Sequence, residues 1–309
     1  MASEKHSWSR IGESMEAVLV QVDGDRITKL SPDESQPMGR HGLSSATLAS
    51  AGASHDPRRL KRPKRRTASG WEEVDWETAI REIGGQIKAI RKQSGVRALG
   101  VYAGAPVGTN TRGLTRTMSF ALGLGTPNLY SPLSTLGGPL LRASELMVGH
   151  PVAWQTDVGR AHFVVLLGAN QDAQGWGPLQ AGRNLAADLA FSRKTKGTKV
   201  VAVDPRRTPG TTGADQHLAI RPGTELYFML AVLDQVLKSG WHEKQYVDDW
   251  CAGLPKLADA AAPWTTERVA PICGITAEEI AGVALKYTRA AMACVHRSPQ
   301  ALQSEHGTL

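Results

Sequence analysis

The chain has 309 residues, a net charge of +7, 41% hydrophobic residues and 21% charged residues, which is enough apolar material for two domains with cores of their own. No apolar run approaches the length of a membrane span, which excludes a membrane-spanning protein. The only cysteines, Cys251, Cys273 and Cys294, lie far apart, which argues against a disulfide framework and favours a reducing, cytoplasmic location.

The N-terminal segment predicts a small β structure followed by a loop. Residues 15–30 favour a β-hairpin with its turn at Asp23-Gly24, and residues 31–70 favour an extended loop because they are rich in Ser, Gly, Pro and charge. Seven basic residues lie between Arg58 and Arg66. A nucleic-acid site is one interpretation of this run. A solvated linker or a rim for cofactor phosphates is the favoured one, because the run has no interleaved aromatic residues.

The next elements predict a first α/β segment over residues 71–150. Residues 76–93 predict a helix with isoleucines on one face, residues 99–102 a short strand, and residues 114–122 a second helix.

Buried parallel strands are predicted over residues 162–167 and 199–203, because both runs are continuously apolar. A helix is expected at 179–190, with a basic turn from Arg193 to Gly197 between that helix and the second strand. The first strand leads into Gly168 and Asn170, a glycine that permits close approach and an amide that can donate and accept.

Asp204 follows the second strand directly, at the strand end where open α/β sheets bind ligands. Its carboxylate is suited to ribose hydroxyls, and the planar guanidinium groups of Arg206 and Arg207 are suited to phosphate oxygens. Ordinary surface charge at a strand end is an equally good interpretation of this segment alone.

A second polar turn follows close behind. Residues 217–220 predict a short strand, and Arg221-Pro-Gly223-Thr224-Glu225 leads into a helix over 226–237. Thr224 is expected to be the N-cap and Glu225 to favour the first turn, where free N–H groups suit an anion or a base edge. Farther along, Thr276 to Glu279 predicts a capping box for a helix to 287, and residues 290–295 predict a strand.

Two familiar nucleotide-binding motifs are missing from the sequence. Neither G-x-G-x-x-G nor G-x-x-x-x-G-K-[ST] occurs, so neither a standard NAD site nor a P-loop is supported. The expected fold is α/β, a small N-terminal β segment followed by Rossmann-like α/β layers with parallel sheets. We divide it into residues 1–70 for the β segment and loop, 71–150 for the first α/β segment, 151–290 for a dinucleotide-binding domain, and 291–309 as the start of a return to the first α/β segment.

Ordered motifs along nearly the whole chain resemble the N-terminal part of a molybdopterin oxidoreductase of the dimethyl sulfoxide reductase family, which includes formate dehydrogenases and nitrate reductases. The matching stretches are residues 55–63, 71–80, Leu124-Gly-Thr-Pro-Asn128, Leu167-Gly-Ala-Asn170, Val203-Asp-Pro-Arg-Arg-Thr208, Ala214-Asp215 and Arg221-Pro-Gly-Thr224.

The resemblance implies that the chain binds one of the two molybdopterin guanine dinucleotides of a molybdenum bis(molybdopterin guanine dinucleotide) cofactor. By similarity, Gly168 and Asn170 line the dinucleotide, Asp204 meets the ribose, and Arg206 and Thr208 meet the phosphates. The turn of Gly223, Thr224 and Glu225 completes this set, and Glu225 stands where the family usually has Asp facing the guanine edge.

The sequence departs from the family in two ways. Many members carry an N-terminal cysteine cluster for iron and sulfur, but no cysteine precedes Cys251 here, and a [4Fe–4S] cluster needs about four thiolates. No iron–sulfur cluster is therefore expected.

The metal ligand of the family follows the segment resembling 124–128, where Ser131 and Ser134 are the candidates, although both also suit an ordinary turn. The sequence also stops where relatives continue, so the chain is expected to be a fragment or one half of a split enzyme.

The leading functional hypothesis is molybdenum-dependent electron or oxygen-atom transfer with a small redox substrate. An electron-transfer subunit or the missing half is the expected partner, and neither nucleic acid nor a membrane span is expected. Two alternatives stay open: a non-catalytic family-like subunit of a larger redox complex, and a plain nucleotide-binding module.

Overall fold

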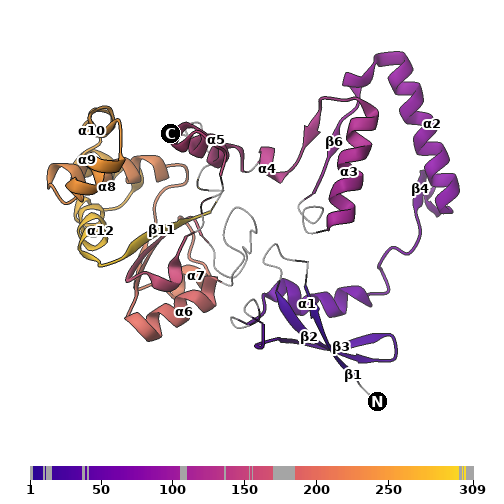
Figure 1. Ribbon diagram of the computed structural model, residues 1–309, viewed down its shortest axis with the longest axis horizontal. Helices are drawn as coiled ribbons and strands as arrows, with labels where there is room; N and C mark the ends of the chain where they lie inside the picture. Colours follow the sequence, from indigo (N-terminus) through magenta and orange to yellow (C-terminus); the bar gives the residue numbers. More distant parts are fainter. Residues whose placement is uncertain are drawn as a thin grey trace. The chain divides into compact units, whose positions relative to one another are not determined.

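A computed structural model describes residues 3–9, 11, 16–36, 39, 42–104, 110–135, 137–152, 154, 156–169, 185–298, 301 and 303. The chain divides into two compact units, Met1–Thr135 and Leu136–Leu309. Figure 1 labels helices and strands of both units.

Unit 1 begins with a three-stranded antiparallel sheet of β1 (Ser3–Trp8), β2 (Ala17–Asp23) and β3 (Arg26–Pro32). The predicted hairpin is present, but Asp23 pairs with Arg26, so the turn consists of Gly24 and Asp25 and lies one residue later than predicted. The sequence did not predict β1, whose six residues are all exposed and which is joined to β2 through its backbone.

The loop predicted over residues 31–70 was wrong for three elements, α1 (Ser45–Ser54), β4 (Lys64–Thr67) and the first residue of β5 (Gly70–Glu73). The helix α1 lacks the apolar periodicity that predicts a helix, and polar contacts fix its start instead. The Ser44 hydroxyl accepts a hydrogen bond from the Thr47 N–H at 3.2 Å, and the buried Glu16 carboxylate accepts from the Ser44 N–H at 2.8 Å. Side-chain capping thus starts this helix, as is common at N-termini.

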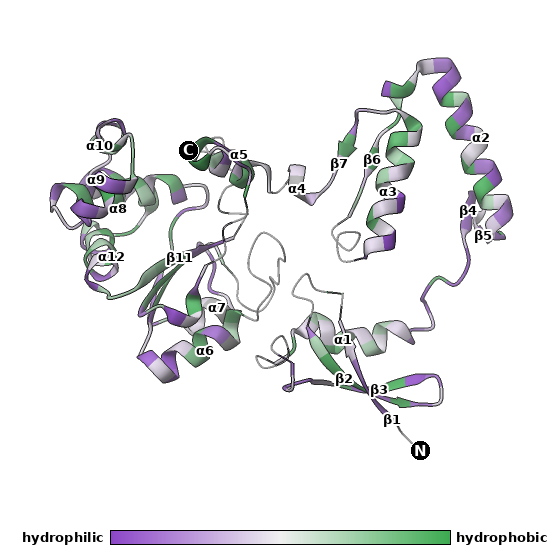
Figure 2. Cartoon of the chain, viewed as in Figure 1, coloured by the Kyte–Doolittle hydropathy of each residue, from purple (hydrophilic) through white to green (hydrophobic). Residues whose placement is uncertain are grey.

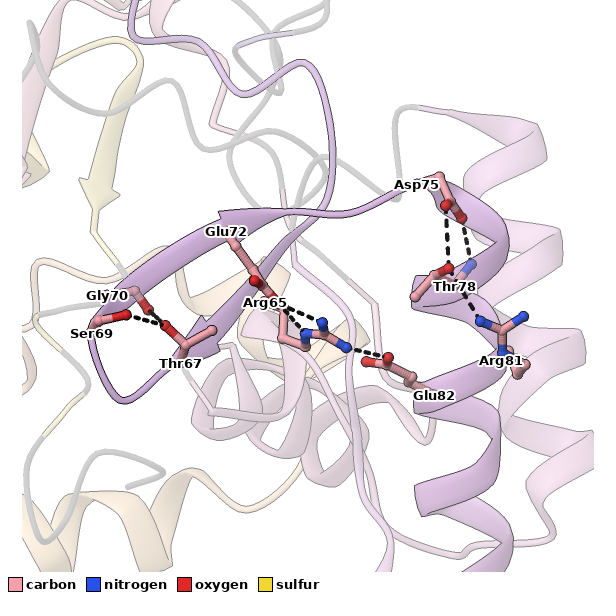
Figure 3. A network of polar contacts seen from close by, with 9 residues as sticks. All are labelled: Arg65, Thr67, Ser69, Gly70, Glu72, Asp75, Thr78, Arg81 and Glu82. Atoms are coloured by element: carbon pink, nitrogen blue, oxygen red, sulfur yellow. Dashed lines mark hydrogen bonds and ion pairs between the residues drawn. The ribbon is translucent and has the colours of Figure 1, made fainter.

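Several residues of the basic run between Arg58 and Arg66 make ion pairs or ring contacts within the chain. Arg65 bonds Glu72 across the β4–β5 hairpin and also Glu82 on the helix α2 (Trp76–Ser94), which ties the hairpin to the helix (Figure 3). Arg58 pairs with Asp56, and the Arg66 guanidinium lies 6.0 Å from the Trp71 ring centroid.

The predicted helix over 76–93 is confirmed as α2, with Asp75 as its N-cap. No residue of α2 is buried, and its isoleucines Ile80 and Ile83 are 67% and 58% exposed. Figure 2 shows hydrophobic and hydrophilic residues alternating along this helix. The described part of unit 1 therefore leaves much of the predicted isoleucine face exposed.

The remaining elements of unit 1 form a small α/β arrangement. It contains a short turn of 3-10 helix (Val96–Ala98), β6 (Val101–Tyr102), α3 (Thr111–Leu124), β7 (Leu129–Tyr130) and α4 (Pro132–Thr135), and β6 pairs with β7 in parallel. The predicted helix over 114–122 is confirmed as the middle of α3.

Unit 2 is built around a four-stranded sheet in the order β10-β9-β8-β11, in which every pair is parallel. The strands are β8 (Phe163–Leu167), β9 (Lys199–Val203), β10 (Gln216–Leu218) and β11 (Ala293–Arg297). The helices are α5 (Gly138–Val148), α6 (Leu185–Lys196), α7 (Pro209–Thr212), α8 (Glu225–Lys238), α9 (Lys244–Trp250), α10 (Leu254–Ala261), α11 (Thr266–Cys273) and α12 (Ala277–Arg289), with a 3-10 turn at Val158–Arg160.

Alternate residues of β8 and β9 supply two cores, because successive side chains of a strand point to opposite faces. On one face Val165 and Val201 pack with Phe228 of α8 and residues of α11 and α12. On the other face Val164 and Val200 pack with Leu189 of α6. Helices therefore cover both faces of the parallel sheet, as the apolar strand runs predicted (Figure 1).

Two sequence-based boundaries differ in unit 2, and one predicted helix start is confirmed. The predicted basic turn is largely the last turn of α6, where Arg193 to Lys196 are helical and Gly197, with φ +66°, ends it. The sequence-based division placed residues from 291 onward in a separate segment, whereas β11 pairs with β8 within the sheet of unit 2. The capping box at Thr276 and Glu279 is confirmed, with both of its hydrogen bonds present.

Two features of composition also have structural counterparts. Cys251, Cys273 and Cys294 are all free thiols, which agrees with the absence of a disulfide framework; Cys273 is buried, Cys294 half-buried and Cys251 exposed. Among the helices that the structure describes, none combines the length and apolar character needed to cross a bilayer.

Candidate functional site

The candidate site lies at the carboxyl edge of the unit 2 sheet. Because the strands are all parallel, the residues that follow β8, β9 and β10 meet at the same edge. The polar residues predicted from the sequence occur in these connections: Gly168 after β8, Asp204 to Thr208 after β9, and Arg221 to Glu225 after β10.

Gly168 closes the end of β8 in a conformation that favours glycine. Its φ is +60°, and its N–H donates to the carbonyl oxygen of Val203 at 2.8 Å. A Cβ at this position would lie 3.3 Å from the Cβ of Ala301, which is tighter than ordinary packing. Glycine therefore holds the backbone of this turn close to its neighbours. Asn170, predicted beside it, lies outside the described residues.

Asp204 is held rigidly at the end of β9. It is 4% exposed, and its N–H donates to the Leu218 carbonyl oxygen at 3.1 Å. Its Oδ1 accepts the Arg206 N–H at 2.7 Å, and its carbonyl oxygen accepts from His217 Nε2 at 2.8 Å. The second carboxylate oxygen, Oδ2, has no hydrogen-bond partner among the described residues, so it can accept one from a ligand.

The residues after Asp204 combine free cations with a packed turn. Arg206 and Arg207 are exposed, and neither guanidinium has a partner in the described part of the chain. Thr208 is 8% exposed, and its N–H and hydroxyl oxygen bond reciprocally with the hydroxyl and N–H of Thr211 at 2.8 and 3.3 Å. Its hydroxyl proton can still be donated to a ligand. The turn therefore presents two exposed cations next to a hydrogen-bonded backbone.

The second turn is anchored differently from what the sequence predicted. Thr224 does occupy the N-cap position of α8, but its side chain makes no cap hydrogen bond, and its hydroxyl instead donates to the Arg221 carbonyl oxygen at 2.6 Å. The Arg221 side chain donates to the Pro271 carbonyl oxygen at 2.6 Å. Gly223, with φ +79°, allows the reversal. The first N–H groups of α8 are thus left without a side-chain cap from Thr224.

Glu225 lies within electrostatic range of Asp204. Burial raises the pKa of Glu225, hydrogen bonds from its own N–H and that of Gly223 oppose the shift, and the negative charge of Asp204 reinforces it. The sheet thus brings together two carboxyl groups that are 21 positions apart in the sequence (225 minus 204). Such a pair favours a ligand that presents hydrogen-bond donors, such as sugar hydroxyls and the N–H edge of a base.

The end of β11 contributes residues that the sequence did not assign to the site. The predicted strand stopped at residue 295, but the observed strand includes His296, which is 7% exposed and has no hydrogen-bond partner for Nδ1 among the described residues. Burial, with a smaller effect from the Arg297 charge, lowers the pKa of His296 to about 4. The buried Ser298 follows, and its N–H donates to the Leu167 carbonyl oxygen at 3.0 Å. The alternation of apolar Val295 with His296 was the signal that could have extended the strand.

The two metal-ligand candidates lie in unit 1, at the start of α4. The Ser134 hydroxyl donates to the Ser131 carbonyl oxygen at 2.9 Å and accepts the Ser131 N–H at 2.9 Å. This is a local turn, and coordination of a metal by a deprotonated Ser134 oxygen would remove the hydrogen bond that its hydroxyl donates to Ser131. Across the described ranges, no group of three or more His, Cys, Asp or Glu side chains is arranged to hold a metal ion.

Comparison with known proteins gives consistent results. A family model described as molybdopterin oxidoreductase matches residues 59–306. The thiosulfate reductase molybdopterin-containing subunit of Salmonella typhimurium is 26% identical over 294 residues, which cover 93% of this chain and 36% of that protein. Acetylene hydratase of Syntrophotalea acetylenica is 27% identical over 218 residues, which cover 70% of this chain and 28% of the relative.

The fold is shared as well. The solved structure of acetylene hydratase from Pelobacter acetylenicus matches 96% of this chain and 40% of its own, with a TM-score of 0.78 and 22% identity. At this identity the likeness concerns the fold alone. The chain spans at most about two fifths of the length of these relatives.

Proposed function

The chain belongs to the molybdopterin oxidoreductase family, and we propose that it binds one molybdopterin guanine dinucleotide at the carboxyl edge of the unit 2 sheet, as part of a molybdenum-dependent oxidoreductase. The observation that carries the proposal is the juxtaposition of Asp204 and Glu225 beside the free guanidinium groups of Arg206 and Arg207. Carboxylates complement the hydroxyls and N–H groups of a nucleoside, and guanidinium groups complement its phosphates.

Three observations at this edge support the proposal. Among the described residues, one oxygen of Asp204 has no hydrogen-bond partner, Gly168 keeps a side chain out of the β8 turn, and Thr224 does not cap the N–H groups of α8. In the proposed complex Asp204 accepts from ribose hydroxyls and Glu225 from the guanine N–H edge. Arg206 and the Thr208 hydroxyl donate to phosphate oxygens. The dinucleotide is lined by Gly168, Asn170, Gly223 and Thr224.

The chain's own contribution is binding and orientation. When bound, the molybdenum–pterin group would supply the electron or oxygen-atom transfer, and the protein would supply position and electrostatics. The matched relatives include a thiosulfate reductase subunit and acetylene hydratase, names that cover different substrates, so no substrate is assigned. Those relatives are more than twice as long, so the proposal gives this chain one dinucleotide only, with turnover depending on further polypeptide.

One observation favours the alternative of a non-catalytic subunit. Ser134, one of the two metal-ligand candidates, has its hydroxyl hydrogen-bonded twice to Ser131. In this alternative the chain still binds the dinucleotide at the carboxyl edge of the unit 2 sheet, but no side chain of the protein coordinates a metal.

Purification from a host that makes the cofactor separates these possibilities. The protein would be analysed for molybdenum, for pterin, for guanine nucleotide released on acid hydrolysis, and for iron, followed by a dye-linked redox assay. Pterin with stoichiometric guanine nucleotide and molybdenum but no iron–sulfur cluster is the expected result. Guanine nucleotide without molybdenum would favour the alternative. A protein that contains no pterin and no guanine nucleotide would contradict the proposal.

A further inference from the structure

A cavity lies at the opposite end of the same sheet from the proposed dinucleotide site, next to the amino ends of β8, β9 and β10. It has a volume of about 850 Å³, and its apolar lining includes Phe163, Val200 and Leu285. Its polar lining comes from His162, Lys199, Asp215, Gln216, Lys286 and Arg289. These residues belong to the strand starts and to the last turn of α12, so they are separate from the residues after the strands that form the proposed dinucleotide site.

Among the described residues that line the cavity, Asp215 is the one carboxylate, and its charge is already neutralised. Asp215 accepts from Lys199 Nζ and Arg193 at 3.1 Å each and from the Val200 N–H at 2.9 Å. Burial acts to raise the pKa of Asp215, but these three donors outweigh it and hold the pKa below its usual value. Asp215 therefore stays ionised, and the pairs it makes leave the cavity without spare negative charge.

The α12 side of the cavity carries positive charge without an acidic partner. Lys286 donates to the neutral Gln216 side chain at 2.9 Å, and the exposed Arg289 guanidinium has no partner among the residues that the structure describes. His162 Nδ1 is shielded from solvent and likewise lacks a hydrogen-bond partner in the described ranges. The cavity thus combines an apolar floor, unneutralised cations and an unpaired ring nitrogen.

We propose that this cavity binds a small organic anion, with an apolar body against Phe163 and Leu285 and a carboxylate or phosphate head at Lys286 and Arg289. Binding pockets for small molecules are commonly concave and mostly apolar with a few polar groups that orient the ligand. Arg289 presents a planar donor pair for an oxyanion, and Lys286 adds a point charge.

The competing explanation is a purely structural role, because basic residues in the last turn of a helix interact favourably with its dipole. That role predicts a loss of stability when they are removed, without any effect on a bound anion. The two explanations therefore differ in what they predict for ligand affinity.

The test uses the full chain and three probes that share one ring system: 2-naphthoate, 2-naphthyl phosphate and the uncharged 2-naphthalenemethanol. Affinity would be measured by titration calorimetry at low and high salt. Both anions should bind, more weakly at high salt, and the alcohol should bind at least tenfold more weakly. The better of the two anions identifies the head group.

Variants locate the site. Arg289→Gln and Lys286→Gln should each weaken anion binding roughly 10- to 100-fold, and Arg289→Lys should retain most of it. Lys194→Gln, on the exposed side of α6, and Arg206→Gln, at the proposed dinucleotide edge, should leave it unchanged. Thermal melting of each variant checks folding.

The proposal would be overturned by equal binding of the alcohol, by unchanged affinity in folded Arg289→Gln, or by an equal loss in Lys194→Gln or Arg206→Gln. Pterin and guanine nucleotide content should be unaffected by Arg289→Gln. Failure of this inference can therefore be told apart from failure of the proposed function.

Discussion

Replacement of Asp204 by asparagine changes one oxygen of the proposed dinucleotide site. In Asp204→Asn, the side-chain carbonyl oxygen can still accept the Arg206 N–H, which lies 2.7 Å from Oδ1, so the turn after β9 should survive. The remaining carboxylate oxygen becomes an amide nitrogen, which donates hydrogen bonds instead of accepting them. Ribose hydroxyls would therefore lose their acceptor.

Two energies of opposite sign decide the size of the effect. Loss of a charge-assisted hydrogen bond weakens binding by about 1.5–3 kcal/mol. Removal of a negative charge also relieves its repulsion of the ligand phosphates. At an assumed separation of about 8 Å in water, that relief is about 0.5 kcal/mol. The hydrogen bond dominates, so affinity should fall roughly 5- to 60-fold, at about 1.4 kcal/mol for each factor of ten.

Titration calorimetry with GDP measures this directly, because GDP carries the guanine, ribose and diphosphate of the proposed ligand. Asp248→Asn is a matched control, since Asp248 is exposed on α9 and away from the sheet edge. Circular dichroism and thermal melting establish that both variants fold. GDP affinity within twofold of the wild type in folded Asp204→Asn would refute the assignment of the ribose contact.

Three further predictions concern stability. Because burial and Asp204 raise the pKa of Glu225 in the folded chain, stability falls as pH rises through that pKa. Glu225→Gln should therefore resist urea better than the wild type at pH 7 and equally at pH 3, and a wild-type advantage at pH 7 would contradict this. Burial holds the pKa of His296 at about 4, below its unfolded value, so stability falls as pH drops from about 6.5 to 4. Over that window the wild type should lose up to about 3 kcal/mol more free energy of unfolding than His296→Leu. Parallel pH profiles of the two proteins would contradict this prediction. Thr276→Ala removes the capping-box hydroxyl of α12 and should lower the free energy of unfolding by about 1 kcal/mol in urea titrations, and an unchanged midpoint would argue against the cap.

Much of the unit 2 sheet could be predicted because its signals are local. The strands β8 and β9 are continuous apolar runs, as a parallel strand buried on both faces requires. The glycine after β8 and the acid after β9 mark where the runs end. The same local reasoning placed Asp204 and Glu225 at strand ends. Their electrostatic coupling depends on which strands are neighbours, and the order β10-β9-β8-β11 could not be derived from either turn alone.

Other features escaped prediction because they depend on distant partners or on competing hydrogen bonds. The helix α1 begins at Ser44 partly because Glu16, 28 residues earlier, binds that residue. The Thr224 hydroxyl could either cap α8 or bond Arg221, and the tight Arg221 turn selects the second. The strand β1 has no apolar alternation, so only its pairing with β2 reveals it.

The pairing of β8 with β11 constrains how unit 2 can fold during synthesis. Phe163 pairs with Ala293, 130 positions later in the chain (293 minus 163). A ribosome that adds about 5–20 residues per second needs roughly 6 to 26 s to cover that interval. Once β9 has been synthesised, the five-residue apolar strand Phe163–Leu167 can pair with it along one edge. The other edge of the strand stays unpaired until β11 has been synthesised. An unpaired apolar strand edge invites pairing with other nascent chains, so the yield of folded protein should depend on chaperones that shield residues 163–167 until β11 emerges.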